Sequence, residues 1–226
     1  MFVESSLATF ESASSTFPST TWGQVGWYLF SKRVLDVIIA ALAMIALTPL
    51  FLLVAIAIKL TSRGPVLFVQ TRVGANGKEF RCYKFRSMVI NAEAMKAKLL
   101  AMSHHADSRT FKMRRDPRVT RVGQLLRKTS VDEMPQLWNV LKGDMSLVGP
   151  RPPLPAEVAK YASHERRRLE VKPGLTCIWQ VYGRGDIPFP QQVEMDISYI
   201  DDRNLWLDLK LMALTIPAVA FGKGAY

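Results

Sequence analysis

The longest apolar stretch of the chain covers residues 37–58, VIIAALAMIALTPLFLLVAIAI, in which Thr48 has the single polar side chain. A helix rises ~1.5 Å per residue, so this stretch would measure roughly 33 Å, which matches the hydrocarbon core of a bilayer. The pattern predicts a membrane helix within residues 32–60.

A proline and the flanking charges determine how this helix meets the bilayer. Pro49 cannot donate to the carbonyl of Ile45, so a kink is expected, and the Thr48 hydroxyl can bond a freed carbonyl. Lys32 and Arg33 precede the run and further basic residues follow it, which places both ends on the cytoplasmic side. Length favours a kinked span. A re-entrant hairpin, bent at Thr48-Pro49 and leaving by the face it entered, also fits.

Downstream of the apolar run, the periodicity changes to that of strands and amphipathic helices. Residues 66–88 contain two β-prone runs around Asn76-Gly77, a dipeptide typical of tight turns, and predict a β-hairpin. Helical patterns follow at residues 91–102, 130–141 and 205–216. The last is so apolar that it belongs to the core, to the head-group layer or to both. The fold class expected is α+β, mostly helical with a small β-hairpin.

The second of these helices contains two adjacent carboxylates. Ser130 is a candidate N-cap, Glu133 would complete a capping box, and Pro135 makes the start irregular. Gly143 lies just past the expected end. Acidic side chains in a first turn complement the helix dipole, so Asp132 and Glu133 need no catalytic role on this pattern alone.

Two segments rich in glycine and proline contain basic side chains. Residues 149–153 (GPRPP) predict a rigid loop around Arg151, and residues 172–186 pair a turn with a β-prone run that ends near Arg184. The alternative is that each segment only connects secondary-structure elements and has no binding role.

Length and charge narrow the class of protein. The 226 residues allow one soluble domain, at residues 61–226, after a loose or interfacial leader at residues 1–31. The net charge of +11 favours anionic partners such as phospholipid head groups, nucleotides or nucleic acid. Cys82 and Cys177 are far apart and belong to no zinc motif, which indicates a reducing compartment and no structural metal.

The candidate chemistry lies where the carboxylates meet the basic residues. Asp132 and Glu133 stand between Arg127 and Arg151 in the sequence, an arrangement suited to phosphate groups. Lys84 lies on the second strand of the hairpin, where successive side chains point to opposite faces. Arg86, two residues further on, is therefore expected on the same face as Lys84. These two can meet lipid head groups or a nucleotide, or form a solvated face.

Five ordered motifs give the chain a family resemblance. They are KRVLDVIIA at residues 32–40, FRCYKFRSM at 80–88, the segment at 116–152 with TSVDEMPQLWNVLKGDMSLVGPRP, KPGLTCIWQVYGRGD at 172–186, and LWLDLKLM at 205–212. Over residues 31–226 the chain resembles the monotopic phosphoglycosyl transferases, bacterial sugar transferases that begin exopolysaccharide and related glycan assembly. Its short form is similar to that of the exopolysaccharide hexose-phosphate and galactose-phosphate transferases.

The resemblance implies a fold, a site and a reaction. The membrane helix would be re-entrant and broken at Thr48-Pro49, and the catalytic domain would face the cytoplasm at the bacterial inner membrane. Sugar 1-phosphate would pass from a UDP-sugar to undecaprenyl phosphate, with release of UMP, through a phosphosugar-aspartyl intermediate. The residues implied are Asp132 and Glu133 as the catalytic dyad, Asp132 as a ligand of Mg²⁺, and Arg127, Arg151, Arg184 and Asp208 as substrate-binding residues.

Two departures from the family pattern and one rival function stay open. Cys177 and Gly185 replace a glycine and an asparagine that members often have, and a positive φ at position 177 would be strained with cysteine. The rival is a non-catalytic, membrane-tethered polyanion-binding or scaffold protein. The basic run at residues 112–128 lacks interleaved aromatic residues, which argues against a nucleic-acid partner. The sugar, the roles of the two carboxylates and assembly into a homo-oligomer are not decided by the sequence.

Overall fold

The computed structural model describes residues 22–92, 94–95, 116–183 and 186–221. Most of the helix expected at residues 91–102, the predicted leader up to residue 21, and Arg184 therefore lie outside the described residues. The rest is mostly helical with two small sheets, as the sequence predicts. In order, the elements are α2 (Trp22–Thr61), β1 (Leu67–Val73), η1 (Ala75–Gly77), β2 (Glu79–Phe85), α4 (Arg121–Lys128), η3 (Val131–Gln136), α5 (Leu137–Lys142), β3 (Ser146–Val148), α6 (Pro155–Val158), η4 (Glu165–Leu169), β4 (Gly174–Thr176), α7 (Ile178–Tyr182), α8 (Phe189–Asp202) and α9 (Leu205–Phe221).

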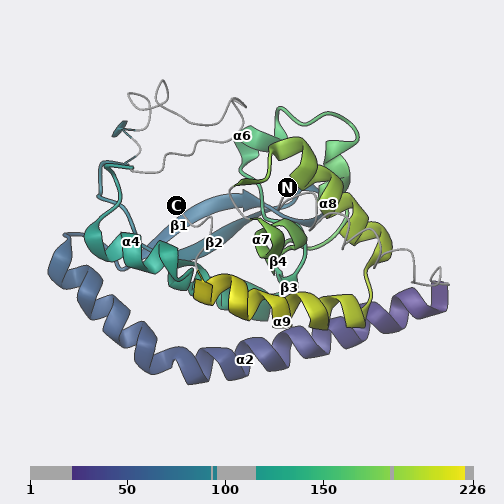
Figure 1. Cartoon of the computed structure of the whole chain (residues 1–226), viewed down its shortest axis with the longest axis horizontal. Coiled ribbons are helices and arrows are strands. Elements are labelled where there is room, and N and C mark those ends of the chain that lie inside the picture. The colour runs from purple at the N-terminus through teal and green to yellow at the C-terminus, as the bar shows by residue number, and fades with distance from the viewer. Residues whose placement is uncertain (1–21, 93, 96–115, 184–185, 222–226) are drawn as a thin grey trace.

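The apolar run forms the middle of α2, which starts inside the predicted leader and remains helical through Pro49. Figure 1 shows α2 bowed beneath the rest of the molecule. The Thr48 hydroxyl donates to the carbonyl of Met44 at 2.8 Å, one residue before the carbonyl that the proline frees. A helix with a separate break at this point is therefore not confirmed.

Along α2, one side packs on the domain and the other consists of exposed apolar side chains. Ala40 and Ile58 are fully buried, whereas Leu42, Ile45 and Leu53 are more than 60% exposed. Within the described residues, α2 is the one helix long and apolar enough to cross a membrane, with a mean hydropathy of 2.8 over its best window. Its exposed surface suits lipid better than water.

The predicted hairpin is present, because the Asn-Gly turn fits the strands that it joins. β1 and β2 are antiparallel, with Gln70 opposite Cys82. Asn76 and Gly77 both have positive φ, 55° and 76°, which is the geometry that asparagine and glycine tolerate.

A second pair of strands, β3 and β4, is parallel. β3 pairs with β4, placing Ser146 opposite Gly174 and Val148 opposite Thr176. A side chain on Gly174 would collide with the backbone of Gly149, so the close approach of these two loops requires glycine. Cys177 has an extended φ of −147°, so the strain expected for cysteine at this position is absent.

The helix α9 runs beside α2 in Figure 1 and has two kinds of surface. Leu207 and Leu211 are buried in the main core, whereas Trp206 and Ile216 are 67% and 73% exposed. This is the mixed role predicted for residues 205–216.

Candidate active site

The two acidic residues lie on a 3₁₀-helix, η3, instead of in the first turn of an α-helix. Ser130 adopts a left-handed conformation with φ 54°, and its side chain makes no capping bond, so the predicted capping box is wrong. The physical reason is the tight turn from α4: the Ser130 amide donates to the carbonyl of Arg127, which takes Ser130 out of the extended conformation that an N-cap needs. Gly143 ends α5 with φ 87°, as expected.

The 3₁₀ geometry points the two carboxylates in different directions. With three residues per turn, neighbours diverge by roughly 120°, and residues three apart lie above one another. Glu133 and Gln136 therefore share one face of η3. Asp132 belongs to another face.

Glu133 is held by two cations. Lys84 Nζ donates to Glu133 Oε1 at 2.6 Å, and Arg151 Nη1 donates to the same oxygen at 3.4 Å. Burial alone would raise the pKa of Glu133, but the charges of Lys84 and Arg151 outweigh it and hold this pKa well below the usual range. Glu133 is therefore an anion at any physiological pH.

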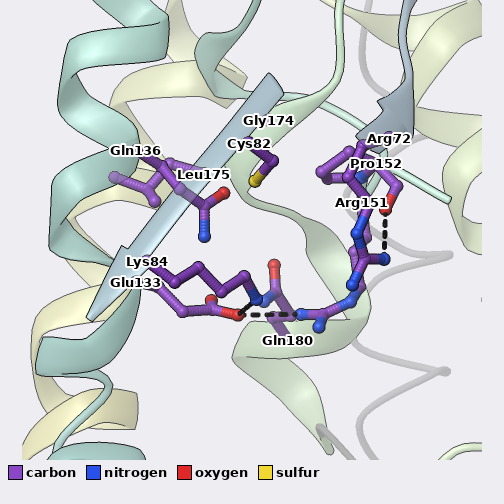
Figure 2. A pocket seen from close by; sticks show the side chains of 10 residues that line it. All are labelled: Arg72, Cys82, Lys84, Glu133, Gln136, Arg151, Pro152, Gly174, Leu175 and Gln180. Carbon is purple, nitrogen blue, oxygen red and sulfur yellow. Dashed lines mark hydrogen bonds and ion pairs between the residues drawn. The ribbon is translucent and has the colours of Figure 1, made fainter. Parts of the chain in front are cut away.

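These three residues border a pocket with roughly 230 Å³ of empty volume. Figure 2 shows Glu133 and Lys84 at one side of the pocket and Arg72, Pro152 and Arg151 at the other, with the end of the Arg151 side chain directed toward Glu133. The lining contains three cations and one carboxylate, and therefore favours an anionic ligand. The lining residues are Arg72, Cys82, Lys84, Glu133, Gln136, Arg151, Pro152, Gly174, Leu175 and Gln180.

Asp132 is outside this lining but belongs to the same charge cluster. Its side chain is 9% exposed, and among the described residues neither of its oxygens has a hydrogen-bond or ion-pair partner. Burial, followed by the charge of Glu133, raises the pKa of Asp132 to about 6, against the opposing charges of Lys84, Arg127 and Arg151. An unpaired carboxylate beside three cations has free oxygens for a new bond.

Four consecutive residues, 84–87, connect the site to the end of α2. Lys84 binds Glu133, and Phe85 packs edge-on against Phe51 of α2 with ring centroids 5.4 Å apart. Arg86 Nη2 donates to the carbonyl and hydroxyl oxygens of Ser62, just past the end of α2. The last residue, Ser87, accepts a bond from Arg127 Nε at 3.0 Å.

The structure therefore brings some predicted site residues together and separates others. Lys84 and Arg151 line the pocket with Glu133, and Arg127 lies within electrostatic reach of Asp132. Arg86, expected on the same face as Lys84, turns to α2 because the strand ends at Phe85.

Asp208 lies apart from the pocket and is bonded to α2. Lys32 Nζ and the Tyr28 hydroxyl donate to Asp208 Oδ2 at 2.8 and 3.0 Å, and the Tyr199 hydroxyl donates to Oδ1 at 2.7 Å. The described contacts of Asp208 thus hold the first part of α2 against α8 and α9.

Several pocket residues were missed by sequence reasoning. Arg72 could have been found, because the register pairs it with Phe80 and so places it on the same strand face as Lys84. Gln136 could have been found with any helical period, because residues three apart share a face, and Cys82 could have been found by its position two residues from Lys84 on one strand. Gln180 gave no local signal.

The described side chains could hold Mg²⁺ only together with oxygen atoms that a substrate provides. Within the described residues there is no group of three acidic, histidine or cysteine side chains that could hold a metal ion. Protein-bound Mg²⁺ often uses one or two carboxylates plus substrate phosphates and water, and the free oxygens of Asp132 meet that requirement.

Comparisons with known proteins agree on one family. The sequence model described as bacterial sugar transferase matches residues 27–222. The galactosyl transferase CpsE of Streptococcus agalactiae is 45% identical over 88% of this chain and 44% of its own length. The exopolysaccharide production protein ExoY of Sinorhizobium fredii is 43% identical over 87% of this chain and 88% of its own. The undecaprenyl-phosphate galactose phosphotransferase of Salmonella typhimurium is 42% identical over 87% of this chain and 42% of its own, so the chain spans less than half of two of these relatives.

Proposed function

Since the chain belongs to the bacterial sugar transferase family, we propose that it transfers a sugar 1-phosphate from a UDP-sugar to undecaprenyl phosphate. The observation that supports this most directly is the unpaired carboxylate of Asp132 next to a pocket with three cations and one carboxylate. Names of relatives as undecaprenyl-phosphate galactose and glucose phosphotransferases point to the same donor and acceptor classes.

In the first step, an Asp132 oxygen attacks the β-phosphorus of the donor. The new bond joins this oxygen to phosphorus, the bond to the bridging oxygen breaks, and UMP leaves with that electron pair. An oxygen of undecaprenyl phosphate then attacks the same phosphorus and restores the carboxylate. Two displacements with a covalent intermediate result.

The surrounding cations make attack of one anion on another feasible. Arg151 and Lys84 border the pocket on the Glu133 side, and Arg127 faces Asp132, so charge that develops on the phosphoryl oxygens meets fixed positive groups. Glu133, already ion-paired, keeps Lys84 and Arg151 oriented. Mg²⁺ held with the help of Asp132 would neutralise further phosphate charge.

The contacts of α2 support a re-entrant anchor with the domain in the cytoplasm. Near its start, Arg33 donates to the carbonyls of Val140 and Leu141 at 2.6 and 2.8 Å, and near its end Ile58 packs with Phe85. A helix that crossed the bilayer would leave these two sets of contacts on opposite sides. One domain in contact with both ends fits a helix that enters and leaves by one face, beside the cytosolic UDP-sugar.

The test of the reaction is the Asp132→Asn variant in purified, lipid-reconstituted protein. We expect loss of both sugar-phosphate transfer and the labelled covalent intermediate, with membrane attachment retained, because the amide cannot act as the nucleophile. Asp144, a partly exposed carboxylate of the same domain, provides the matched control as Asp144→Asn. Full transfer by Asp132→Asn would exclude the proposed nucleophile.

The product identifies the bond that breaks. A panel of UDP-sugars with undecaprenyl phosphate and Mg²⁺ should yield UMP, whereas UDP would indicate transfer of the sugar without its phosphate. A polyanion-binding or scaffold protein would release neither UMP nor UDP, and Asp132→Asn would not change its binding.

A further inference from the structure

Gln136 has an unpaired side chain inside the pocket. It is 3% exposed, and among the described residues its carboxamide has no hydrogen-bond partner. Figure 2 shows this carboxamide pointing into the pocket, between the strand with Cys82 and the Glu133–Lys84–Arg151 group. Its nitrogen and oxygen are not among the sealed polar atoms that lack a partner, so they reach the solvent of the pocket, where a polar ligand can take the place of water.

The position of Gln136 follows from the 3₁₀ geometry of η3. Because residues three apart lie above one another, the side chain of Gln136 is aligned with that of Glu133 and faces the same cations. The amide group thus lines the same pocket as the Glu133 carboxylate, one turn further along η3.

The charges around this amide define the ligand class. Arg72, Lys84 and Arg151 contribute three positive charges, and Glu133 contributes one negative charge. Arg72 has no ion pair among the described residues: its Nη1 and Nη2 donate to the Pro152 carbonyl at 2.9 Å and to Gln70 Oε1 at 2.7 Å, and its Nε is buried without a partner. Burial, followed by the charge of Arg151, lowers the pKa of Arg72, which shows that the two guanidinium groups repel each other. An anion with charge spread over several oxygens relieves this repulsion.

We propose that Gln136 is a binding residue for the diphosphate group of the donor, to which its amide N–H donates beside Arg72 and Arg151. The proposal rests on the proposed function and extends it, since it assigns the donor's diphosphate to the Glu133 face of η3. The β-phosphorus of this diphosphate must then extend toward the Asp132 face, where the proposed first step takes place.

If Gln136 served only to stabilise the fold, replacing it would lower the melting temperature. A role in ligand binding predicts no such loss. The described contacts give its amide no bond to lose, so Gln136→Leu, of similar size, should leave the melting temperature of the free protein unchanged or raise it. The same change should remove one donor to a charged ligand and weaken diphosphate binding about tenfold.

The experiment measures binding of inorganic pyrophosphate and of UDP by calorimetry, with the full chain in lipid nanodiscs and Asp132→Asn as the parent to prevent turnover. Gln136→Leu should weaken both ligands about tenfold. Two control variants should bind both ligands as the parent does. Gln191→Leu changes an exposed glutamine on α8, and Arg81→Gln changes an exposed arginine on the face of β2 opposite to Lys84. Gln136→Asn retains the amide on a shorter side chain and provides a second variant with a smaller loss of affinity, in case leucine prevents folding.

Unchanged pyrophosphate affinity in folded Gln136→Leu or Gln136→Asn would overturn the inference, as would an equal loss in Gln191→Leu. If pyrophosphate binding depends on Gln136 but no UDP-sugar yields UMP, the diphosphate site stands and the proposed reaction fails. If UMP forms in an Asp132-dependent way but Gln136 variants bind pyrophosphate as the parent does, the reaction stands and the inference fails.

Discussion

At the residue scale, two neighbouring carboxylates acquire different chemistry from their surroundings. Glu133 has Lys84 and Arg151 as partners and stays ionised, whereas Asp132 has no hydrogen-bond partner among the described residues and a pKa raised to about 6. Adjacent acids whose pKa values are pushed apart typically take different roles. Asp132 suits the nucleophile, and Glu133 suits a fixed anion that orients cations.

The pKa of Asp132 sets a pH dependence for the first step. Because only the carboxylate attacks phosphorus, formation of the covalent intermediate should rise as pH increases through about 6 and level off above 7. Single-turnover labelling with a radioactive UDP-sugar between pH 5 and 8 measures this. A rate independent of pH over that range would contradict the assignment.

The same pKa predicts a stability effect with a definite sign. The folded protein holds the Asp132 proton up to about pH 6, whereas the unfolded chain releases it near the ordinary value of 3.8. Folding stability is therefore lost as pH rises between these values, and asparagine does not titrate. Asp132→Asn should gain stability over wild type by on the order of 1–3 kcal/mol at pH 7 and by much less at pH 4. Thermal unfolding at both pH values measures the difference, and an equal difference at both would contradict the shift.

Residue spacing predicted part of the site and missed the rest. Arg151 was found because basic residues near a carboxylate pair suggest phosphate, and Lys84 was found because strand alternation gave it a face that could meet a nucleotide. Gln136 was missed although residues three apart share a face in both α- and 3₁₀-helices, because a neutral amide adds nothing to a pattern of charges. Arg184 lies outside the described residues, and its phosphate-binding role stays a prediction.

At the element scale, α2 is tied to the domain by polar contacts near its start. Asp36 accepts a bond from the amide of Leu147 in β3 at 2.9 Å, and Lys32 pairs with Asp208 at the start of α9. Buried polar pairs of this kind are costly to break one side at a time. They fix the rotation of a helix whose apolar surface is too uniform to fix it alone.

The ion pair between Lys32 and Asp208 predicts that Asp208 stabilises the protein through its contact with Lys32. In a double-mutant cycle, Lys32→Met and Asp208→Asn should each destabilise the protein by about 1–3 kcal/mol, and the double variant by less than their sum. Thermal unfolding in nanodiscs, with Lys142→Met as an exposed control, measures the coupling. Additive losses, together with a raised KM for the donor in Asp208→Asn alone, would favour the substrate-binding role predicted from the sequence.

Local sequence signals predicted some elements better than others. The hairpin followed from Asn76-Gly77, because that dipeptide fits the turn that β1 and β2 require. The β3–β4 pair could not be predicted, because each strand has three residues and the two are joined across η4 and α6. Such short strands have no periodicity, and tertiary contacts alone define them.

At the scale of the whole molecule, the long apolar helix α2 and α9 lie along one side of the domain (Figure 1). On the proposed function, this side is expected to face the lipid. Family membership could be predicted from ordered motifs. The helix that continues through Pro49 agrees with the continuous, kinked helix that length favoured, whereas the break implied by the resemblance is not confirmed.

Membrane orientation can be tested with single cysteines, because native Cys82 and Cys177 are buried. Gly26→Cys, which meets no atom within 4 Å, and Lys59→Cys, at an exposed position, mark the two ends of α2. A membrane-impermeant maleimide should label both in inside-out vesicles and neither in intact spheroplasts. Gln191→Cys on α8 is the control for the domain itself, and labelling of one end from each side would establish a span.

Residues 84–87 join the end of α2 to Glu133 and Arg127 within four consecutive positions, through Ser62 and Phe51 on one side and Lys84 and Ser87 on the other. On the proposed function, a tilt of α2 set by the length of the acyl chains would reach these residues through few contacts, so the rate of transfer is expected to depend on lipid composition.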